Sequence, residues 1–138
     1  VIIRSPKSTR PWQHVLDVIY GYMKLAVKLK HSSRLNGEAF NFGPDKNNLK
    51  VIDVLNKMKL FWPKIGWKIK KQNKFKENNL LHLNSDKAKK ILKWSTSLNF
   101  NNSIKFTVEW YKNYLNKNTN IYKYSLKQIL NYQKIVKK

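Results

Sequence analysis

Apolar side chains recur at spacings of three and four residues in several stretches of the chain, and this period predicts helices. The predicted helices cover residues 13–30, 51–62, 86–92, 102–115 and 125–136. In the first of them, one face carries Val15, Ile19, Met23, Ala26 and Val27, and we expect this face to point inward. The second is predicted to end at Pro63, which cannot continue a helix.

The later helices carry signals at their ends as well as an apolar face. Ser85 is placed to cap the short helix, and Ser125 with Gln128 has the spacing of a capping box. The faces expected to be buried comprise Ile104, Val108, Tyr111 and Leu115 in one helix, and Leu126, Ile129, Leu130 and Ile135 in the last. We expect the terminal region, 117–138, to form a helix that frays at its end.

Short strands are predicted between these helices. Residues 1–4 are apolar, residues 67–70 alternate between apolar and polar, and residues 38–42 form a short apolar run that ends at Gly43. Alternating helices and strands indicate an α/β class, but the strands are too few for a complete doubly wound sheet. The first residues resemble the inside of a strand, so we expect the chain to be the later part of a longer protein.

Composition narrows the class of protein. The 138 residues suffice for one domain with a real core, and 41% are hydrophobic, which is unlike a disordered polycation. The chain has no cysteine, which excludes disulfides and thiolate metal sites and fits a reducing cytosol. No apolar run approaches the ~20 residues of a membrane span. Three scattered histidines and seven acidic residues show no metal-ligand spacing.

The net charge of +22, from 29 basic and 7 acidic residues, raises two interpretations. Charge of this size favours a nucleic-acid partner, because neutralised phosphates release counterions. The lysines, however, are scattered along nearly every segment instead of forming one stripe. We favour a solvated surface that follows from composition, and keep a small basic nucleic-acid-binding module as the alternative.

The densest recognition chemistry lies in Arg10-Pro11-Trp12-Gln13-His14-Val15-Leu16-Asp17, directly before the first predicted helix. This run resembles the Arg-x-aromatic-x-His-Val-x-Asp signature of nucleotide-sugar 4,6-dehydratases and epimerases of the extended short-chain dehydrogenase type. The residues from Arg10 to Leu16 most resemble members that act on CDP-glucose. Members that act on GDP-mannose and related epimerases remain the alternative within the family.

Four further stretches resemble the same family in the same order, so the resemblance covers essentially the whole chain. They are residues 39–45, residues 77–84, residues 85–94 and residues 107–111. Two positions depart from the family pattern. Asn84 stands where an aspartate is usual, and Lys93 stands where a glycine is usual, so Lys93 must end the short helix without the conformational freedom of glycine.

The resemblance implies that residues 1–138 are the substrate-binding, C-terminal region of an extended Rossmann-type enzyme. It implies NAD as cofactor, held by an N-terminal half outside this sequence, and conversion of CDP-glucose to CDP-4-keto-6-deoxyglucose. The chain has no Gly-x-x-Gly-x-x-Gly turn, and Tyr20 and Lys24 match the spacing of a catalytic pair only in the wrong context. We therefore expect the chain alone to be inactive, and the full-length enzyme to be cytoplasmic and homo-oligomeric.

Candidate substrate-binding residues follow from the resemblance and from their chemistry. Arg10 suits a diphosphate, because a guanidinium grips phosphate oxygens bidentately. Trp12 is a candidate for stacking on a base or sugar, although an aromatic side chain at a helix start is more often core. Lys74 is placed to neutralise the diphosphate, and Glu77 resembles an acid that accepts from ribose hydroxyls. His14 is expected to support the loop and not to catalyse.

Overall fold

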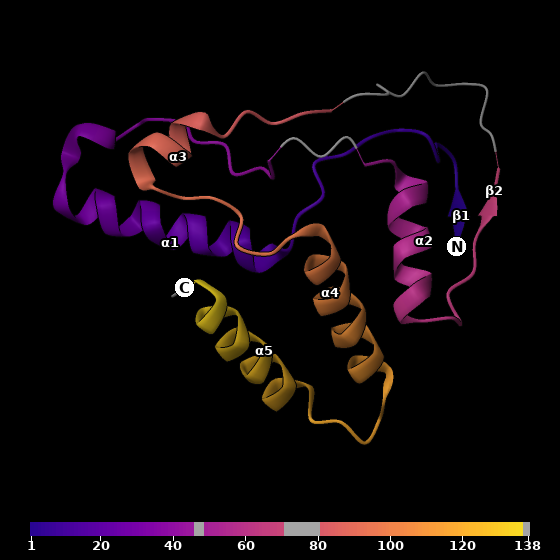
Figure 1. The fold of residues 1–138 in the computed structure, drawn as a ribbon. Coiled ribbons are helices and arrows are strands. Elements are labelled where there is room, and N and C mark those ends of the chain that lie inside the picture. The colour runs from indigo at the N-terminus through magenta and orange to yellow at the C-terminus, as the bar shows by residue number, and fades with distance from the viewer. Residues whose placement is uncertain (46–48, 71–80, 137–138) are drawn as a thin grey trace.

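The computed structural model describes residues 1–45, 49–70 and 81–136, and these are mostly helical. In chain order the elements are β1 (Ile2–Ile3), α1 (Val15–His31), a 3₁₀ turn (Ser33–Leu35), α2 (Val51–Phe61), β2 (Lys68–Ile69), α3 (Asp86–Leu92), α4 (Phe100–Leu115) and α5 (Ile121–Val136). Helices α1 and α3 lie at one end of the molecule and α2 with the strands at the other, with α4 and α5 between them (Figure 1). This arrangement is compatible with part of an α/β protein.

The two strands form a small parallel sheet. Ile2 lies opposite Lys68 and Ile3 opposite Ile69, and the Lys68 amide donates to the Val1 carbonyl at 2.9 Å. The strands predicted near 1–4 and 67–70 are therefore confirmed, although each pairs over two residues only. No helix within the described residues is long and apolar enough to cross a membrane.

Two apolar clusters hold the helices together. The first contains Phe42, Ala88, Leu92 and Trp94, and it packs α3 against the inner side of α1. The second contains Val54, Ile104 and Val108, and it packs α2 against α4. The burial predicted for Ile104 and Val108 is confirmed.

The inward face predicted for α1 was wrong. Val15, Ile19, Met23 and Val27 are 60%, 44%, 62% and 60% exposed, and Ala26 is exposed as well. The helix instead turns its Asp17 and Gly21 positions inward, with Val18 and Leu25 packed against the first cluster. Helix α1 is apolar on two sides, and periodicity cannot decide which side the described part of the chain covers.

The strand predicted over residues 38–42 is not formed. Phe42 is buried, as expected of that segment, but no described strand lies beside it. A strand exists only where a neighbouring chain accepts and donates its backbone hydrogen bonds, so an apolar run alone does not make one.

The predicted ends of the helices were correct in part. Helix α3 spans the predicted residues, and Lys93 ends it with φ 50° and ψ 42°, in the left-handed region. The capping box of Ser125 and Gln128 was wrong, because α5 begins at Ile121 and both residues lie inside it. Their side chains tie α5 to α4: Ser125 accepts from the Trp110 indole at 2.9 Å, and Gln128 donates to the Phe106 carbonyl at 2.8 Å.

Burial along α4 and α5 also differs from the prediction. Tyr111 and Leu115 are exposed, because α4 is covered on the side of Ile104 and Val108. Leu126, Ile129 and Leu130 are exposed too, and α5 is anchored instead by Tyr132, which is 4% exposed. Helix α5 is described as far as Val136, and the fraying of its end stays a prediction.

Candidate functional site

The loop that carries the Arg10 signature, residues 5–14, is fixed along the start of α2. The amides of Val51 and Ile52 donate to the carbonyls of Ser8 and Pro6, both at 3.0 Å. Thr9 forms an antiparallel bridge with Lys50, and Ser8 is 2% exposed. Since several backbone bonds hold it in register, this loop presents its side chains from a defined position; we call it the Arg10 loop.

Arg10 stands in the middle of the Arg10 loop and is half-buried. Its guanidinium donates to the Thr9 carbonyl at 2.7 Å, and its own carbonyl accepts from the Trp12 amide at 2.9 Å. These contacts hold a permanently charged group against a compact turn. Such a group binds phosphate or carboxylate oxygens in bidentate geometry.

Trp12 is placed mainly as a packing residue. Its indole packs against the second apolar cluster, and its Nε1 donates to the Leu49 carbonyl at 3.1 Å. The ring therefore connects the Arg10 loop to the helices behind it. Contact of Trp12 with a substrate stays a prediction.

Gln13 and His14 join the Arg10 loop to α1. The Gln13 amide donates to the Phe42 carbonyl at 2.5 Å. His14 is the N-cap of α1, and its Nδ1 accepts from the Leu16 amide at 3.3 Å while its ring meets Phe106 edge to face at 5.6 Å. The imidazole is 6% exposed, so its geometry is that of a supporting residue.

The pKa of His14 is lowered by burial, which outweighs the opposing effect of Asp17. Because the folded-state pKa lies below the unfolded one, the unfolded chain takes up the proton first as the pH falls. The contribution of His14 to stability is therefore complete above about pH 6.5 and declines below it. We expect urea midpoints to fall between about pH 7.5 and about pH 5.5.

The matched control for this titration is His14→Asn. Asparagine keeps a side-chain acceptor at the N-cap of α1 but has no proton to gain in this pH range. The variant should show a flatter dependence of the urea midpoint on pH. An unchanged slope would assign the dependence to other groups.

A buried carboxyl group that sequence reasoning missed connects three parts of the chain. Asp17 is 0% exposed, and its Oδ1 accepts from the Ser97 amide and the Tyr132 hydroxyl, both at 2.8 Å. Its Oδ2 accepts from the Leu98 amide at 3.4 Å, and its carbonyl accepts from the Trp94 indole at 2.9 Å. Burial and the bond to Asp17 raise the pKa of Tyr132. One feature of the sequence could have indicated this burial. Asp17 lies one helical turn before Gly21, so the two residues share a face of α1.

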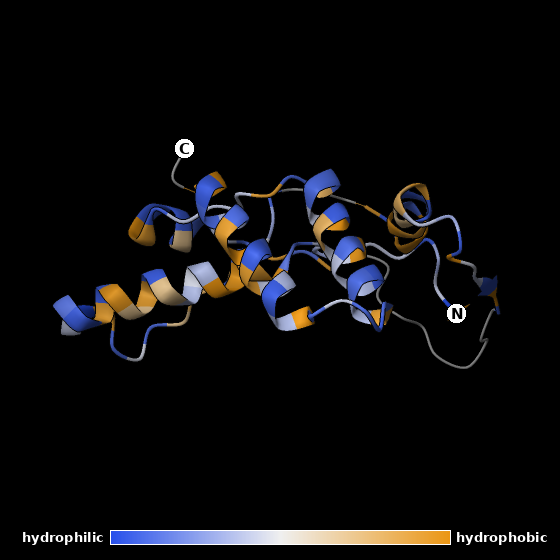
Figure 2. Ribbon diagram, turned by 90° about the horizontal axis from the view of Figure 1, so that it is seen from below, coloured by the Kyte–Doolittle hydropathy of each residue, from blue (hydrophilic) through white to orange (hydrophobic). Residues whose placement is uncertain are grey.

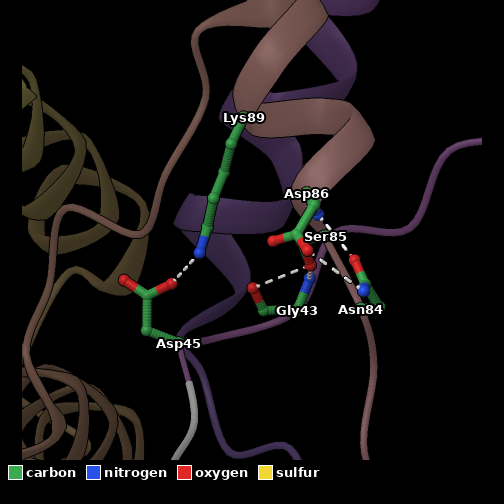
Figure 3. A network of polar contacts seen from close by, with 6 residues as sticks. All are labelled: Gly43, Asp45, Asn84, Ser85, Asp86 and Lys89. Atoms are coloured by element: carbon green, nitrogen blue, oxygen red, sulfur yellow. Dashed lines mark hydrogen bonds and ion pairs between the residues drawn. The ribbon is translucent and has the colours of Figure 1, made fainter.

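A second polar network fixes the segment after Phe42 to the start of α3 (Figure 3). The predicted N-cap position of Ser85 is confirmed, but its hydroxyl forms no capping bond to α3. The hydroxyl instead accepts from the Gly43 amide at 2.7 Å and donates to the Gly43 carbonyl at 3.1 Å. Asn84 takes over the cap by accepting from the Asp86 amide at 2.8 Å.

Ion pairs reinforce this network from the helix side. Lys89 pairs with Asp45 (Figure 3), and Lys87 pairs with Glu38 at 2.6 Å. Both pairs are exposed, so each adds little to stability. An open hollow of about 450 Å³ lies beside them, bordered by Pro44, Asp45, Leu83 and Asp86 among others.

A hollow of about 490 Å³ lies where the start of α1 meets α4 and α5. Its lining is mainly apolar, with Val15, Trp110, Tyr111 and Ile129 on its walls. It is separate from the Arg10 side chain, which is not among its lining residues.

The described residues contain no cluster of three or more groups that could hold a metal ion. The four glycines of the chain, Gly21, Gly37, Gly43 and Gly66, are scattered and form no glycine-rich turn. A dinucleotide pyrophosphate requires such a turn at a helix start. The sequence of this chain therefore offers no glycine-rich turn for that pyrophosphate.

Comparison with known proteins gives a clear relative. The chain is 33% identical over 114 residues to CDP-glucose 4,6-dehydratase of Salmonella typhimurium. The similarity to CDP-glucose 4,6-dehydratase is confirmed. The match covers 81% of this chain but 32% of the dehydratase, so the chain spans about a third of that relative's length. No family model matches the chain.

The resemblance to the dehydratase marks four candidate residues, and the structure places two of them. Arg10 and Trp12 share the Arg10 loop but point to different surroundings, one to its turn and one to the core. Lys74 and Glu77 lie outside the described residues. Their relation to Arg10 stays a prediction.

Tyr20 and Lys24 have structural partners of their own. The Lys24 ammonium donates to the carbonyls of Leu92 and Lys93 at 3.3 and 2.9 Å, at the end of α3. The Tyr20 ring meets the Tyr132 ring edge to face at 6.3 Å. These contacts give both residues a packing role, as expected of a pair outside the catalytic context of a dehydratase.

Proposed function

We propose that the chain is the substrate-binding, C-terminal part of an extended Rossmann-type nucleotide-sugar 4,6-dehydratase in the cytoplasm. The proposed reaction converts CDP-glucose to CDP-4-keto-6-deoxyglucose in a homo-oligomeric enzyme. NAD would be held by the part of the enzyme that this chain does not span, because the glycine-rich cradle is lacking here. The chain by itself would be inactive.

The observation that carries the proposal is the fixed position of Arg10 in a loop that matches the dehydratase signature. The backbone bonds of Ser8 and Pro6 to α2 keep the loop from rearranging. A preorganised guanidinium loses little freedom when it binds an anion, so it fits the diphosphate of a nucleotide sugar. Holding the diphosphate would orient the sugar toward the cofactor.

The remaining candidates have supporting roles in the proposal. Lys74 would add positive charge near the diphosphate, and Glu77 would accept from the ribose hydroxyls. Trp12 would contribute mainly by holding the Arg10 loop, with its indole bonded to the Leu49 carbonyl. The identity of the nucleotide base is the least supported part of the proposal. GDP-mannose is the alternative substrate within the same reaction class.

Binding of CDP to the chain, followed by calorimetry, tests the role of Arg10. We expect Arg10→Ala to weaken CDP binding at least tenfold, about 1.4 kcal/mol, because it removes a bidentate charged contact. The affinity of Arg10→Lys for CDP should lie between those of the parent chain and Arg10→Ala, since an ammonium keeps the charge but lacks the planar geometry of a guanidinium. The matched control is Arg34→Ala, which removes an exposed arginine outside the loop.

Two results would contradict the proposal. One is CDP binding that Arg10→Ala leaves unchanged. The other is preference for a single-stranded oligonucleotide over CDP, with an affinity that falls steeply with salt, which would favour the basic nucleic-acid-binding module. Tighter binding of GDP than of CDP would keep the reaction class and change the substrate.

A further inference from the structure

Helix α5 carries an apolar stripe that the described part of the chain leaves exposed. Tyr122, Leu126, Ile129 and Leu130 are 70%, 43%, 39% and 57% exposed, and their spacing places them along one side of the helix. We call these four residues the α5 stripe. It rises roughly 12 Å along the helix, at about 1.5 Å per residue. Helix α5 lies at the edge of the molecule in Figure 1, and Figure 2 shows hydrophobic and hydrophilic residues side by side along it.

A different side of α5 is fixed to the rest of the chain, so the α5 stripe is held outward. The Tyr132 hydroxyl donates to the Asp17 carboxyl at 2.8 Å. The Ser125 hydroxyl accepts from the Trp110 indole at 2.9 Å. Both residues lie on the side of α5 that faces α1 and α4. Exposure of the stripe is therefore a consequence of how the helix is anchored.

A row of lysines runs beside the α5 stripe. Lys123, Lys127 and Lys134 are exposed and are spaced by four and seven residues, so they share one side of the helix. The first two directly follow stripe residues, which places the lysine row along the edge of the stripe. Residues 121–136 contain no acidic side chain, and within the described residues no ion pair involves these three lysines. Helix α5 thus combines an apolar side with an adjoining cationic side.

We propose that α5 is an interfacial helix that docks this chain on an anionic lipid bilayer. A helix with these two sides lies in the plane of the bilayer surface. The α5 stripe would enter the boundary between headgroups and acyl chains, and the lysine row would contact the lipid phosphates. Tyr122 suits this depth, since a tyrosine ring is apolar while its hydroxyl is polar. This role goes beyond the proposed function and does not depend on CDP binding.

The charge of the chain favours an anionic bilayer over a second copy. Each chain carries a formal charge of +22, so two copies repel one another. An anionic leaflet instead attracts basic residues close to its surface.

The shape of the stripe favours a bilayer over an acidic protein. Ile129 lines the hollow of about 490 Å³, but Tyr122, Leu126 and Leu130 do not. Most of the stripe therefore lies on the convex side of a helix, with no pocket there for the anchoring side chain of a protein partner. A fluid bilayer needs no matching shape, because its lipids rearrange around the helix.

Sedimentation with lipid vesicles tests the proposal. One set of vesicles consists of phosphatidylglycerol, which is anionic, and the other of phosphatidylcholine, which is neutral overall. We expect the chain to bind phosphatidylglycerol vesicles at about 0.1 M salt, where the Debye length is about 10 Å. Binding to phosphatidylcholine should be weaker by about tenfold or more, because the lysine row then lacks its counter-charge. Binding to phosphatidylglycerol should also weaken as the salt concentration rises.

Substitutions in the α5 stripe locate the contact. Leu126→Asp places a charge on its apolar side and should weaken binding to phosphatidylglycerol by about tenfold or more. Tyr122→Asp repeats the test at a more exposed position, so the measurement remains possible if Leu126→Asp does not fold. The matched control is Leu60→Asp on α2, where the side chain is 72% exposed. It should bind within about twofold of the parent chain. Circular dichroism verifies that the variants are folded.

A pair of lysine substitutions separates local charge from overall charge. Lys123→Gln combined with Lys127→Gln removes two charges from the lysine row and should weaken binding by about tenfold or more. The matched control is Lys28→Gln combined with Lys30→Gln, which removes two exposed charges from α1. Both double variants carry the same formal charge. The control should bind within about twofold of the parent chain, because screening limits the attraction to charges near the bilayer.

Several outcomes would overturn the inference. They are equal binding to both kinds of vesicle, undiminished binding by both stripe variants, equal losses for the two lysine pairs, and a lipid-free dimer that Leu126→Asp dissociates. Another is loss of vesicle binding on co-expression with the part of the Salmonella typhimurium dehydratase outside the matched region, which would show that protein covers the stripe. Vesicle binding as expected, while Arg10→Ala leaves CDP binding unchanged, upholds this inference and overturns the role of Arg10.

Discussion

Replacing Asp17 with alanine is expected to lower the free energy of unfolding by about 3–5 kcal/mol. The carboxyl group is 0% exposed and receives hydrogen bonds from Ser97, Leu98 and Tyr132. Its removal leaves three buried or half-buried donors without their acceptor, and each such donor costs free energy because water cannot replace the carboxyl. Urea denaturation followed by tryptophan fluorescence measures the change.

The control for Asp17 is Asp86→Ala. Both aspartates lie in the first turn of a helix, so both interact favourably with the helix dipole. Asp86, however, is exposed. The expected loss for Asp86 is about 1 kcal/mol or less. Tyr132→Phe removes a single hydrogen bond of the network. Its loss in free energy of unfolding should lie between those of Asp17→Ala and Asp86→Ala. Equal losses for Asp17 and Asp86 would show that the buried network contributes nothing beyond the helix dipole.

Replacing Gly21 with alanine is expected to destabilise the fold by about 2–3 kcal/mol, although alanine favours a helix by about 1 kcal/mol. An added β-carbon would lie 2.6 Å from Cε1 of Phe42 and 3.0 Å from Nε1 of Trp94. Trp94 is 1% exposed and its indole is bonded to the Asp17 carbonyl, so it has no room to withdraw. The overlap therefore outweighs the helix preference.

Gly66→Ala is the matched control for Gly21. A β-carbon at Gly66 would meet nothing within 4 Å, and its backbone does not require the left-handed region. We expect this variant to be neutral or slightly stabilised in the same urea experiment. A neutral result for Gly21→Ala would show that α1 and residues 40–42 can separate at little cost.

Local sequence predicts α3 more completely than it predicts α1. The start of α3 followed from the local sequence at Ser85 and Asp86, and the resemblance placed its end at Lys93. The position of α1 also followed from spacing. Which side of α1 is buried did not follow, because both sides are apolar and only packing against Phe42 and Trp94 selects one.

The residues of the candidate site also differ in how far the local sequence indicates their roles. The supporting role of His14 was implied by the resemblance, and its bond at the N-cap of α1 agrees with it, because capping depends on neighbours in the chain. The role of Arg10 stays a prediction. The burial of Asp17 was not evident, because its partners Ser97 and Tyr132 lie 80 and 115 residues away. The partner of the Ser85 hydroxyl was not evident for the same reason, since Gly43 lies 42 residues away.

The sequence by itself therefore determined the helical segments, the Arg10 signature and the resemblance to a dehydratase. These depend on spacing and side-chain chemistry within a few residues. Only the tertiary structure decided that Asp17 is a buried acceptor and that Val15, Ile19, Met23 and Val27 of α1 are exposed. The physical reason is that burial is a property of two surfaces in contact, and the period of one helix describes only its own surface.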